Sequence, residues 1–444
     1  MKILNQFAYL LLLQFSITTL FSETVKDRKG AVLADRVKME QNERWIYNDI
    51  EAAFEKAKVQ NKPLLVTLRC VPCLACIGMD AEVLLENQTI STLLDQFICV
   101  RIINANQLDL SKFQFDYDLS FSVLTFNGDG TLYNRFGSWE HQKDPQNKST
   151  KSFESALEGA LALHSKYPAN QKKLSGKQGK SISYRTPLDI PGIKGKFREE
   201  LDWNGQVVRS CVHCHQINDS TRWLERNRRR SLNSQQIYPY PASSILGFVL
   251  NEEYPIQVIE TKAGSPAQEA GFKPGDIIHE ASGQEITSEA DFSWVLHHLS
   301  SVVDELKIMT QRGKQKGILK INLSEGWKKK SDISRRVGTW PMRAMAFGGM
   351  KLEELSPSAK KSMGLSQNEL ALEAKHVGQY NKHALAKRAG WRKGDILIEI
   401  AGDNQRRSEG ELIGWILEKQ KPGQSLQGIA LRSGKKINLK IPVQ

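Results

Sequence analysis

Cysteine is scarce in this chain, and long apolar runs are absent beyond its first segment. The 444 residues include six cysteines, and five of them lie in two tight clusters. A disulfide framework would spread its cysteines along the chain, so this clustering indicates redox, metal or haem chemistry. After the N-terminal segment, no run reaches the roughly 18–20 apolar residues that a membrane-spanning helix needs.

The bulk composition is that of a globular protein with several domains. Hydrophobic residues make up 40% and charged residues 25% of the chain. At roughly 100–200 residues per domain, the length predicts about three domains. The net charge of +13 favours acidic partners or anionic surfaces but carries no information about the fold.

Residues 1–22 have the pattern of a secretory signal peptide. Lys2 supplies the positive charge, residues 7–20 are apolar, and Ser22 is a small residue where cleavage is expected. The alternative is an uncleaved anchor helix. We therefore expect export to the periplasm or cell envelope, an oxidising compartment with no stable transmembrane segment left after cleavage. Export disfavours nucleic acid as a partner.

Residues 40–167 show a pattern of helices and strands around the first cysteine cluster. We expect, in order, a helix over 45–57, a strand over 64–68, the cysteines, a helix over 79–85, strands over 98–103, 122–127 and 132–136, and a helix over 153–163. This order resembles a thioredoxin-like domain of the Dsb-related kind. Cys99 falls within a strand, where a small buried core residue is expected.

The first cluster holds the candidate catalytic residues Cys70, Cys73 and Cys76. A cysteine at a helix N-terminus is stabilised as thiolate, and a second one a turn later resolves the mixed disulfide. We favour Cys73 as nucleophile and Cys76 as resolver, with Cys70 as an accessory thiol. A Cys70–Cys73 pair is the other register. Three thiolates could instead hold copper or zinc, or the cluster could be an inert remnant.

One thioredoxin feature is missing from this region. Thioredoxins carry a cis-proline just before the third strand, whereas Phe121 and Ser122 stand here. The handling of substrate is therefore expected to differ from that of a thioredoxin.

Residues 168–243 combine a basic linker with a Cys-x-x-Cys-His segment. The linker is expected to be a solvated strap over a surface. Cys211, Cys214 and His215 match the attachment signature of haem c, in which His215 binds the iron. No Met or His occurs between His215 and His279, so the usual axial Met is missing. A zinc site that includes His215 and a plain dithiol remain as alternatives.

The arginines that follow this motif form a basic group on an expected helix. Arg226 and residues 228–230 could face haem propionates or an acidic redox partner. A solvated helix face is the other interpretation.

Two stretches of the C-terminal half resemble each other and PDZ domains of the kind attached to exported HtrA-type proteases. They span residues 244–324 and 340–444, and they share Ala-Gly and Gly-Asp elements at 270–276 and 389–395. In such modules, backbone amides of a glycine-containing loop capture the C-terminus of a partner peptide. By this resemblance, the candidate peptide-binding residues are Leu246, Gly247, Phe248, Val249, Gly348, Gly349 and Met350. There is no serine-protease nucleophile motif upstream.

The order of these parts, with LRCVPC, QFDYDLS, YPAN and CVHCHQ, resembles the thioredoxin-like/PDZ (seleno)protein family of exported bacterial proteins. The resemblance implies a multi-domain α/β and α+β fold: a thioredoxin-like domain, a small helical Cys-x-x-Cys-His segment and two β-rich PDZ-type domains. It also implies redox work at Cys70 or Cys73, because selenocysteine can replace a cysteine near there.

Two hypotheses of different class follow. The first is an exported redox protein that combines thiol–disulfide exchange and electron transfer through haem with docking of partner C-termini and of a redox partner protein. The second is a non-catalytic PDZ adaptor with structural or metal-holding cysteines.

Overall fold

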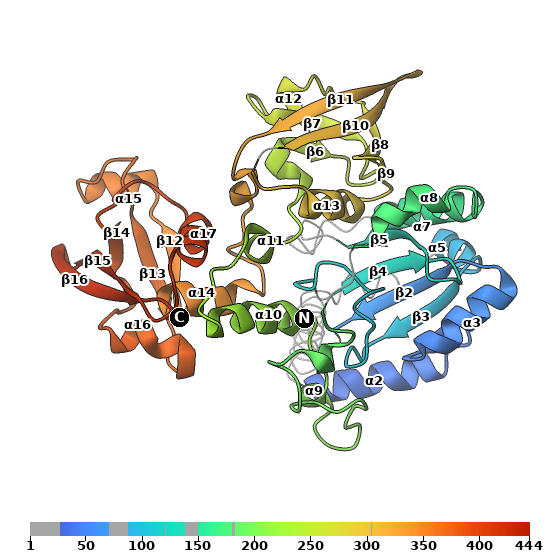
Figure 1. Cartoon of the computed structure of the whole chain (residues 1–444), viewed down its shortest axis with the longest axis horizontal. Helices are drawn as coiled ribbons and strands as arrows, with labels where there is room; N and C mark the ends of the chain where they lie inside the picture. The colour runs from blue at the N-terminus through green and yellow to red at the C-terminus, as the bar shows by residue number, and fades with distance from the viewer. Residues whose placement is uncertain (1–26, 71–87, 120, 138–149, 180–182, 303) are drawn as a thin grey trace, which may run out of the picture.

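The computed structural model describes residues 27–70, 88–119, 121–137, 150–179, 183–302 and 304–444. Three β-containing modules are arranged around a helical middle segment (Figure 1). Within these ranges, no helix is both long enough and apolar enough to cross a membrane. Cys73, Cys76 and the helix expected over 79–85 lie outside the described residues.

The first module is a five-stranded sheet with helices on both faces. The strand order is β1-β3-β2-β4-β5, with β1, β2 and β3 parallel and β4 and β5 antiparallel to their neighbours. The strands are β1 Trp45–Tyr47, β2 Leu64–Arg69, β3 Ile98–Ile102, β4 Phe121–Phe126 and β5 Leu132–Phe136. The helices are α2 Arg28–Glu40, α3 Ile50–Gln60, α5 Gln88–Leu94 and α7 Thr150–His164.

The core of this module follows the two-residue period of β2. Leu64 and Val66 pack with the residues under α3, whereas Leu65 packs with those under α7. Cys99 is 1% exposed within the α7-side cluster, so its expected place in the core is confirmed. The helix expected over 45–57 was wrong at its start, because residues 45–47 pair with β3 as the edge strand β1 and the helix begins only after Asp49 caps it.

The middle segment is built of short helices. These are α8 Gln171–Leu174, η2 Ser175–Lys177, η3 Pro187–Asp189, α9 Val207–Ser210, α10 His215–Asn227 and α11 Ser234–Ile237. The expectation of a solvated strap holds only in part, because most of its described basic residues are exposed but other residues of the segment are buried. Lys177 is 1% exposed and pairs with Asp291, and Ile190 and Ile193 form a small core with Leu110.

The third module carries the first PDZ-type repeat. It contains η4 Ser243–Leu246, β6 Phe248–Leu250, β7 Val258–Thr261, α12 Pro266–Glu269, β8 Ile277–Ala281, β9 Gln284–Glu285, α13 Glu289–His298, β10 Asp304–Arg312 and β11 Gln315–Leu323. Strands β6 and β7 form a ribbon, and the others form a sheet in the order β11-β10-β8-β9.

The last module repeats this plan with one continuous sheet, β12-β13-β14-β15-β16. Its elements, with the turn η5 Trp327–Lys330 before them, are α14 Thr339–Phe347, β12 Met350–Glu354, α15 Pro357–Ser362, β13 Leu372–Val377, η6 Asn381–Ala384, α16 Leu385–Arg388, β14 Ile396–Ile400, α17 Glu409–Lys419, β15 Ser425–Arg432 and β16 Lys435–Pro442.

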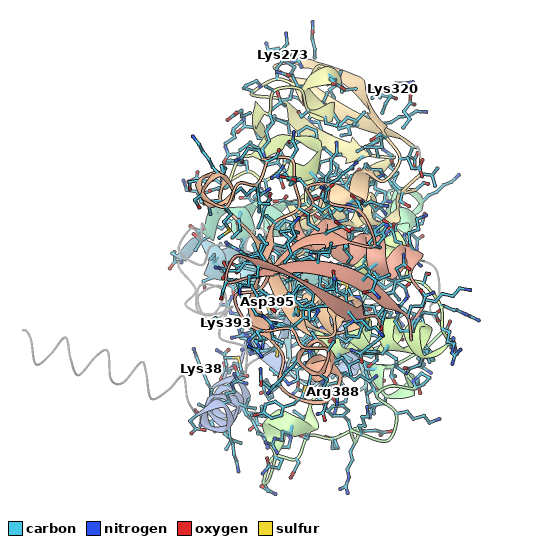
Figure 2. All side chains as sticks on the ribbon, turned by 90° about the vertical axis from the view of Figure 1, so that its left-hand side faces the viewer. Lys38, Lys273, Lys320, Arg388, Lys393 and Asp395 are labelled. Carbon is cyan, nitrogen blue, oxygen red and sulfur yellow. The ribbon has the colours of Figure 1, made fainter. Side chains whose placement is uncertain are left out.

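The modules are held to one another by buried polar contacts. Helix α13 packs on β5 of the first module, where Lys177 Nζ lies 2.9 Å from Asp291 Oδ2 and both side chains are 1% exposed. Helix α10 extends from the first module toward the last one (Figure 1). Lys38, Lys320 and Arg388 lie on three different modules (Figure 2).

Candidate functional site

Cys70 follows directly after β2, at the carboxyl end of the central strands of the first module. This edge carries the redox cysteines of a thioredoxin-like fold, because the following helix begins there. Cys70 is half-buried and is the residue of the first cluster whose position the structure describes.

The second cluster lies between α9 and α10, and buried Asn106 of the first module anchors it. Val212 N donates to Asn106 Oδ1 at 2.7 Å, and Asn106 Nδ2 donates to Ser210 O at 2.9 Å. Asn106 is fully buried, so these bonds fix the backbone on both sides of Cys211. Sequence reasoning missed Asn106, because no local pattern around a loop asparagine indicates a hydrogen-bond partner about a hundred residues away.

The two cysteine clusters meet through a histidine. Cys70 Sγ lies 3.1 Å from His213 Nδ1, although the two residues are 143 positions apart in the chain. Sequence reasoning assigned no role to His213. Its position between Cys211 and Cys214 was the available signal, but only the tertiary contact gives it a partner.

One small cavity is lined by the groups of both clusters. Its walls include Cys70, Cys211, His213 and Cys214, closed by apolar residues of the first module and of α9. Cys214 also packs against the core under α3. The cavity has a volume of about 30 Å³, enough for one or two water molecules.

The protonation of the site follows from its burial. Desolvation raises the pKa of Cys211 to about 11 and that of Cys214 to about 12. Desolvation also lowers the pKa of His213, and the neighbouring His215 adds to this. At neutral pH the two thiols therefore keep their protons, and His213 is neutral.

The cavity beside Cys211 and Cys214 measures about 30 Å³, whereas cofactor sites take roughly 300–1,000 Å³. Across the described ranges, no three His, Cys, Asp or Glu side chains are grouped as metal ligands.

His215, the expected iron ligand, begins a chain of polar contacts that leads away from the thiols. Its Nδ1 lies 2.9 Å from Asp219 Oδ2, and Asp219 pairs with Arg222. Burial alone would raise the pKa of Asp118, but Arg336 and Arg222 together lower it. These charges tie α10 to the loop before β4 and to the segment between the two repeats.

The arginines after the motif have a structural role. Arg226 is 1% exposed, and its guanidinium donates to the backbone oxygens of Gln444 and Gln420 at 2.7 and 3.0 Å. The expectation that Arg226 faces solvent, haem or an acidic partner was therefore wrong. Residues 228–230 are exposed.

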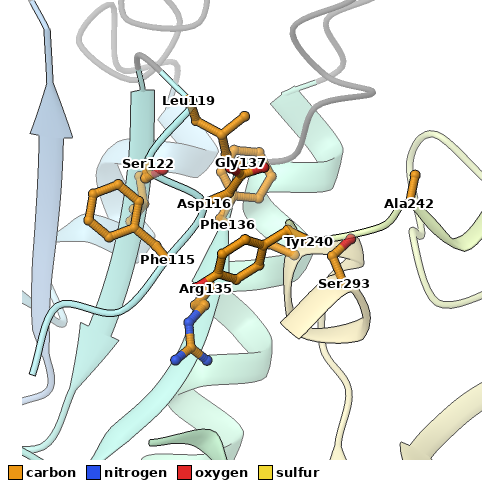
Figure 3. A pocket seen from close by; sticks show the side chains of 12 residues that line it. Phe115, Asp116, Leu119, Ser122, Arg135, Phe136, Gly137, Tyr240, Ala242 and Ser293 are labelled. Atoms are coloured by element: carbon orange, nitrogen blue, oxygen red, sulfur yellow. The ribbon is translucent and has the colours of Figure 1, made fainter. Parts of the chain in front are cut away.

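The region without the cis-proline is covered by the middle segment and the first repeat. Leu119 and Ser122 line a cavity of about 20 Å³ with Tyr240, Ala242 and Ser293 (Figure 3). In a thioredoxin this loop faces substrate. Here Tyr240 and Ser293 of α13 line the cavity beside it.

The predicted peptide-binding residues lie where each repeat begins. In the first repeat, Leu246 ends η4, Gly247 has a φ of +93°, and Phe248 and Val249 start β6. A Cβ on Gly247 would come within 2.1 Å of the Ser265 side chain, so glycine is required there. The Gly247 amide donates to Ser244 O at 3.0 Å.

The equivalent loop of the second repeat is closed by its own helix. The Gly348 and Gly349 amides donate to Ala344 O and Arg343 O, both at 3.1 Å, and Met350 begins the edge strand β12. These two amides are thus already paired within the chain.

Comparisons with known proteins agree with the first module and with the first PDZ-type repeat. A thioredoxin-like family model matches residues 45–128, and a PDZ domain family model matches residues 244–323. The chain therefore contains a thioredoxin-like domain and a PDZ domain. No curated protein matches.

Solved structures with detectable similarity include HtrA-type proteases. One is the HtrA-type protease AlgW, in a variant form with a decapeptide, at 18% identity and a TM-score of 0.22 over 42% of this chain and 53% of that chain. Another is AlgW with a tripeptide, at 17% identity and a TM-score of 0.20 over 33% of this chain and 54% of that one. The chain thus spans about half the length of these structures.

Proposed function

We propose that this chain is an exported thiol–disulfide oxidoreductase whose PDZ-type modules dock partner proteins. The observation that carries the proposal is the 3.1 Å contact between Cys70 Sγ and His213 Nδ1. A histidine in this position accepts the thiol proton and leaves a thiolate, which is the nucleophile of disulfide exchange. The contact favours the register in which Cys70 and Cys73 form the active pair.

Insulin reduction driven by dithiothreitol tests this activity. Loss of turnover in Cys70→Ser would support the Cys70–Cys73 register, whereas loss in Cys76→Ser alone would support Cys73 with Cys76. A wild-type chain that leaves insulin disulfides intact, yet binds peptides with a free C-terminus and not their amidated forms, would make it a PDZ adaptor without redox activity.

The role of His213 is tested by the alkylation rate of Cys70 in a chain carrying Cys73→Ser and Cys76→Ser. We expect His213→Ala to slow the reaction with iodoacetamide at pH 7 roughly tenfold, because less thiolate is present. His376→Ala is the matched control, since His376 is exposed on β13 of the second repeat. Equal rates in all three chains would contradict the proposed pair.

Haem c attachment at Cys211, Cys214 and His215, with zinc as the alternative, stays a prediction. The visible spectrum of protein from a host that matures c-type haem tests it. A sharp band in the dithionite-reduced protein that Cys211→Ala removes would support haem, whereas a flat spectrum would contradict it. N-terminal sequencing of the exported protein tests cleavage after about residue 22.

A further inference from the structure

The Cys-x-x-Cys-His segment is placed for chemistry with the first cluster. Asn106 fixes the backbone beside Cys211, Cys214 packs on the core of the first module, and both thiols line the same small cavity as Cys70. A segment that served only as a connector would not need thiols in that cavity.

We propose that Cys211 and Cys214 form a second dithiol–disulfide pair that exchanges directly with Cys70 inside one molecule. This inference rests on the proposed thiol–disulfide function and names the internal partner of that site. Cysteines spaced Cys-x-x-Cys at the start of a helix are typical of exchanging pairs, and Cys214 immediately precedes α10.

The exchange step balances without any outside oxidant. The Cys70 thiolate attacks one sulfur of the Cys211–Cys214 disulfide, forming a new S–S bond to it. The Cys211–Cys214 bond breaks, and its electron pair leaves on the other sulfur. That thiolate takes up the proton that Cys70 lost to His213 Nδ1. A further thiol of the first cluster then attacks Cys70 Sγ and displaces the sulfur that is bound to it, which takes up the proton of the attacking thiol. Cys211 and Cys214 are then reduced, and the first cluster is oxidised by two electrons.

Full-length variants that keep only one thiol from each side test the contact. One chain carries Cys73→Ser, Cys76→Ser and Cys211→Ser, and a second carries Cys214→Ser in place of Cys211→Ser. The control carries Cys73→Ser, Cys76→Ser, Cys211→Ser, Cys214→Ser and Asn227→Cys. Asn227 is exposed at the far end of α10, about 20 Å along the helix from Cys214.

In a glutathione redox buffer, we expect at least one of the first two chains to form the Cys70 cross-link at least about tenfold more than the control, because the effective concentration is high. Proteolysis under non-reducing conditions and mass spectrometry identify the linked peptides. Cross-linking no greater than in the control, in chains whose circular dichroism equals that of the wild type, would overturn the proposal.

A second measurement uses the unaltered chain. A reagent that bridges two nearby thiols should link Cys70 to Cys211 or Cys214 in the reduced wild type. Links confined to one cluster would count against the proposed exchange. Insulin reduction by Cys211→Ser/Cys214→Ser with dithiothreitol separates the two proposals. If this double variant keeps its turnover and the single-thiol chains form no cross-link, the oxidoreductase proposal holds and the exchange between Cys70 and the second pair is contradicted.

Discussion

The two PDZ-type repeats share a scaffold but differ at the entrance of the peptide groove. In the first repeat, Arg312 donates to Asp276 at 2.7 Å and to Gly271 O at 2.9 Å. In the second, Arg432 makes the matching bonds to Asp395 and Gly390 O, all at 2.7 Å. This correspondence supports a common fold for the second repeat, which the PDZ family model does not cover.

The two repeats differ in the groups that bind the first residue of one helix, Glu289 of α13 or Glu409 of α17. In the first repeat, Ser243 Oγ donates to Glu289 of α13 at 2.8 Å. In the second, Arg343 of α14 pairs with Glu409 of α17, at 2.9 and 2.6 Å, and the amide of Leu352 on β12 also donates to Glu409 at 2.7 Å. Helix α14 packs on both α17 and β12, as the shorter η4 packs on both α13 and β6 in the first repeat.

The two repeats thus share a turn and an ion pair but differ in the residues just before the glycine loop. In the second repeat they form a buried amphipathic helix, and in the first they form a single 3-10 turn.

The largest expected effect is at the ion pair of the second repeat. Arg343→Ala leaves the buried carboxylate of Glu409 without its cation, and both side chains are nearly inaccessible, at 2% and 4%. We expect a loss of about 3–5 kcal/mol in the free energy of unfolding of this module. Urea unfolding of the full chain measures it, and Arg406→Ala, which removes an exposed arginine from the same module, is the control. A loss as small as that of Arg406→Ala would show that the Arg343–Glu409 pair does not hold α14 against α17.

The matched aspartates should give nearly equal and intermediate effects. Asp276→Asn and Asp395→Asn each weaken the bonds that a buried carboxylate accepts from arginine and from the amide three residues earlier, Lys273 or Arg392. The expected loss is about 1–3 kcal/mol in either repeat. A difference of more than about 2 kcal/mol between the two would contradict the common scaffold.

The aspartate of the first repeat also sets a pH dependence. Burial would raise the pKa of Asp276, but the hydrogen bonds from Arg312 and the Lys273 amide lower it overall. A carboxylate whose pKa is lower in the folded state stabilises the fold above its unfolded pKa of about 3.9, and this is lost as the pH falls through its folded pKa. Below about pH 4, the free energy of unfolding of the wild type should therefore fall more steeply than that of Asp276→Asn, and urea unfolding at a series of pH values measures the difference.

The smallest expected effect is at the entrance of the first repeat. Ser243→Ala removes one hydrogen bond to Glu289, for which we expect a loss of about 1 kcal/mol. Thermal unfolding measures it against Ser324→Ala, which alters an exposed serine of the same module. A loss as large as that of Arg343→Ala would mean that Ser243 stabilises the first repeat as strongly as Arg343 stabilises the second.

Sequence reasoning found most of the elements of the first module, because their apolar periods are local. It failed at residues 45–47, where a helical pattern is overridden by pairing with β3. It also failed at Lys177 and Arg226, whose burial depends on Asp291 and on backbone carbonyls far away in the chain. A basic residue in a loop is exposed by default, and only a distant partner makes its burial stable.

The cysteine spacings, the glycine turns and the apolar periods together determined the module types and named Cys70, Cys211 and Cys214 as candidates. These signals lie within a few residues of one another, so the chain alone reveals them. Only the tertiary structure decided that Cys70 faces His213, that Asn106 anchors the second cluster, and that α14 packs on α17 and β12. Each of those depends on which surfaces bury one another across long stretches of chain, and no local pattern encodes that choice.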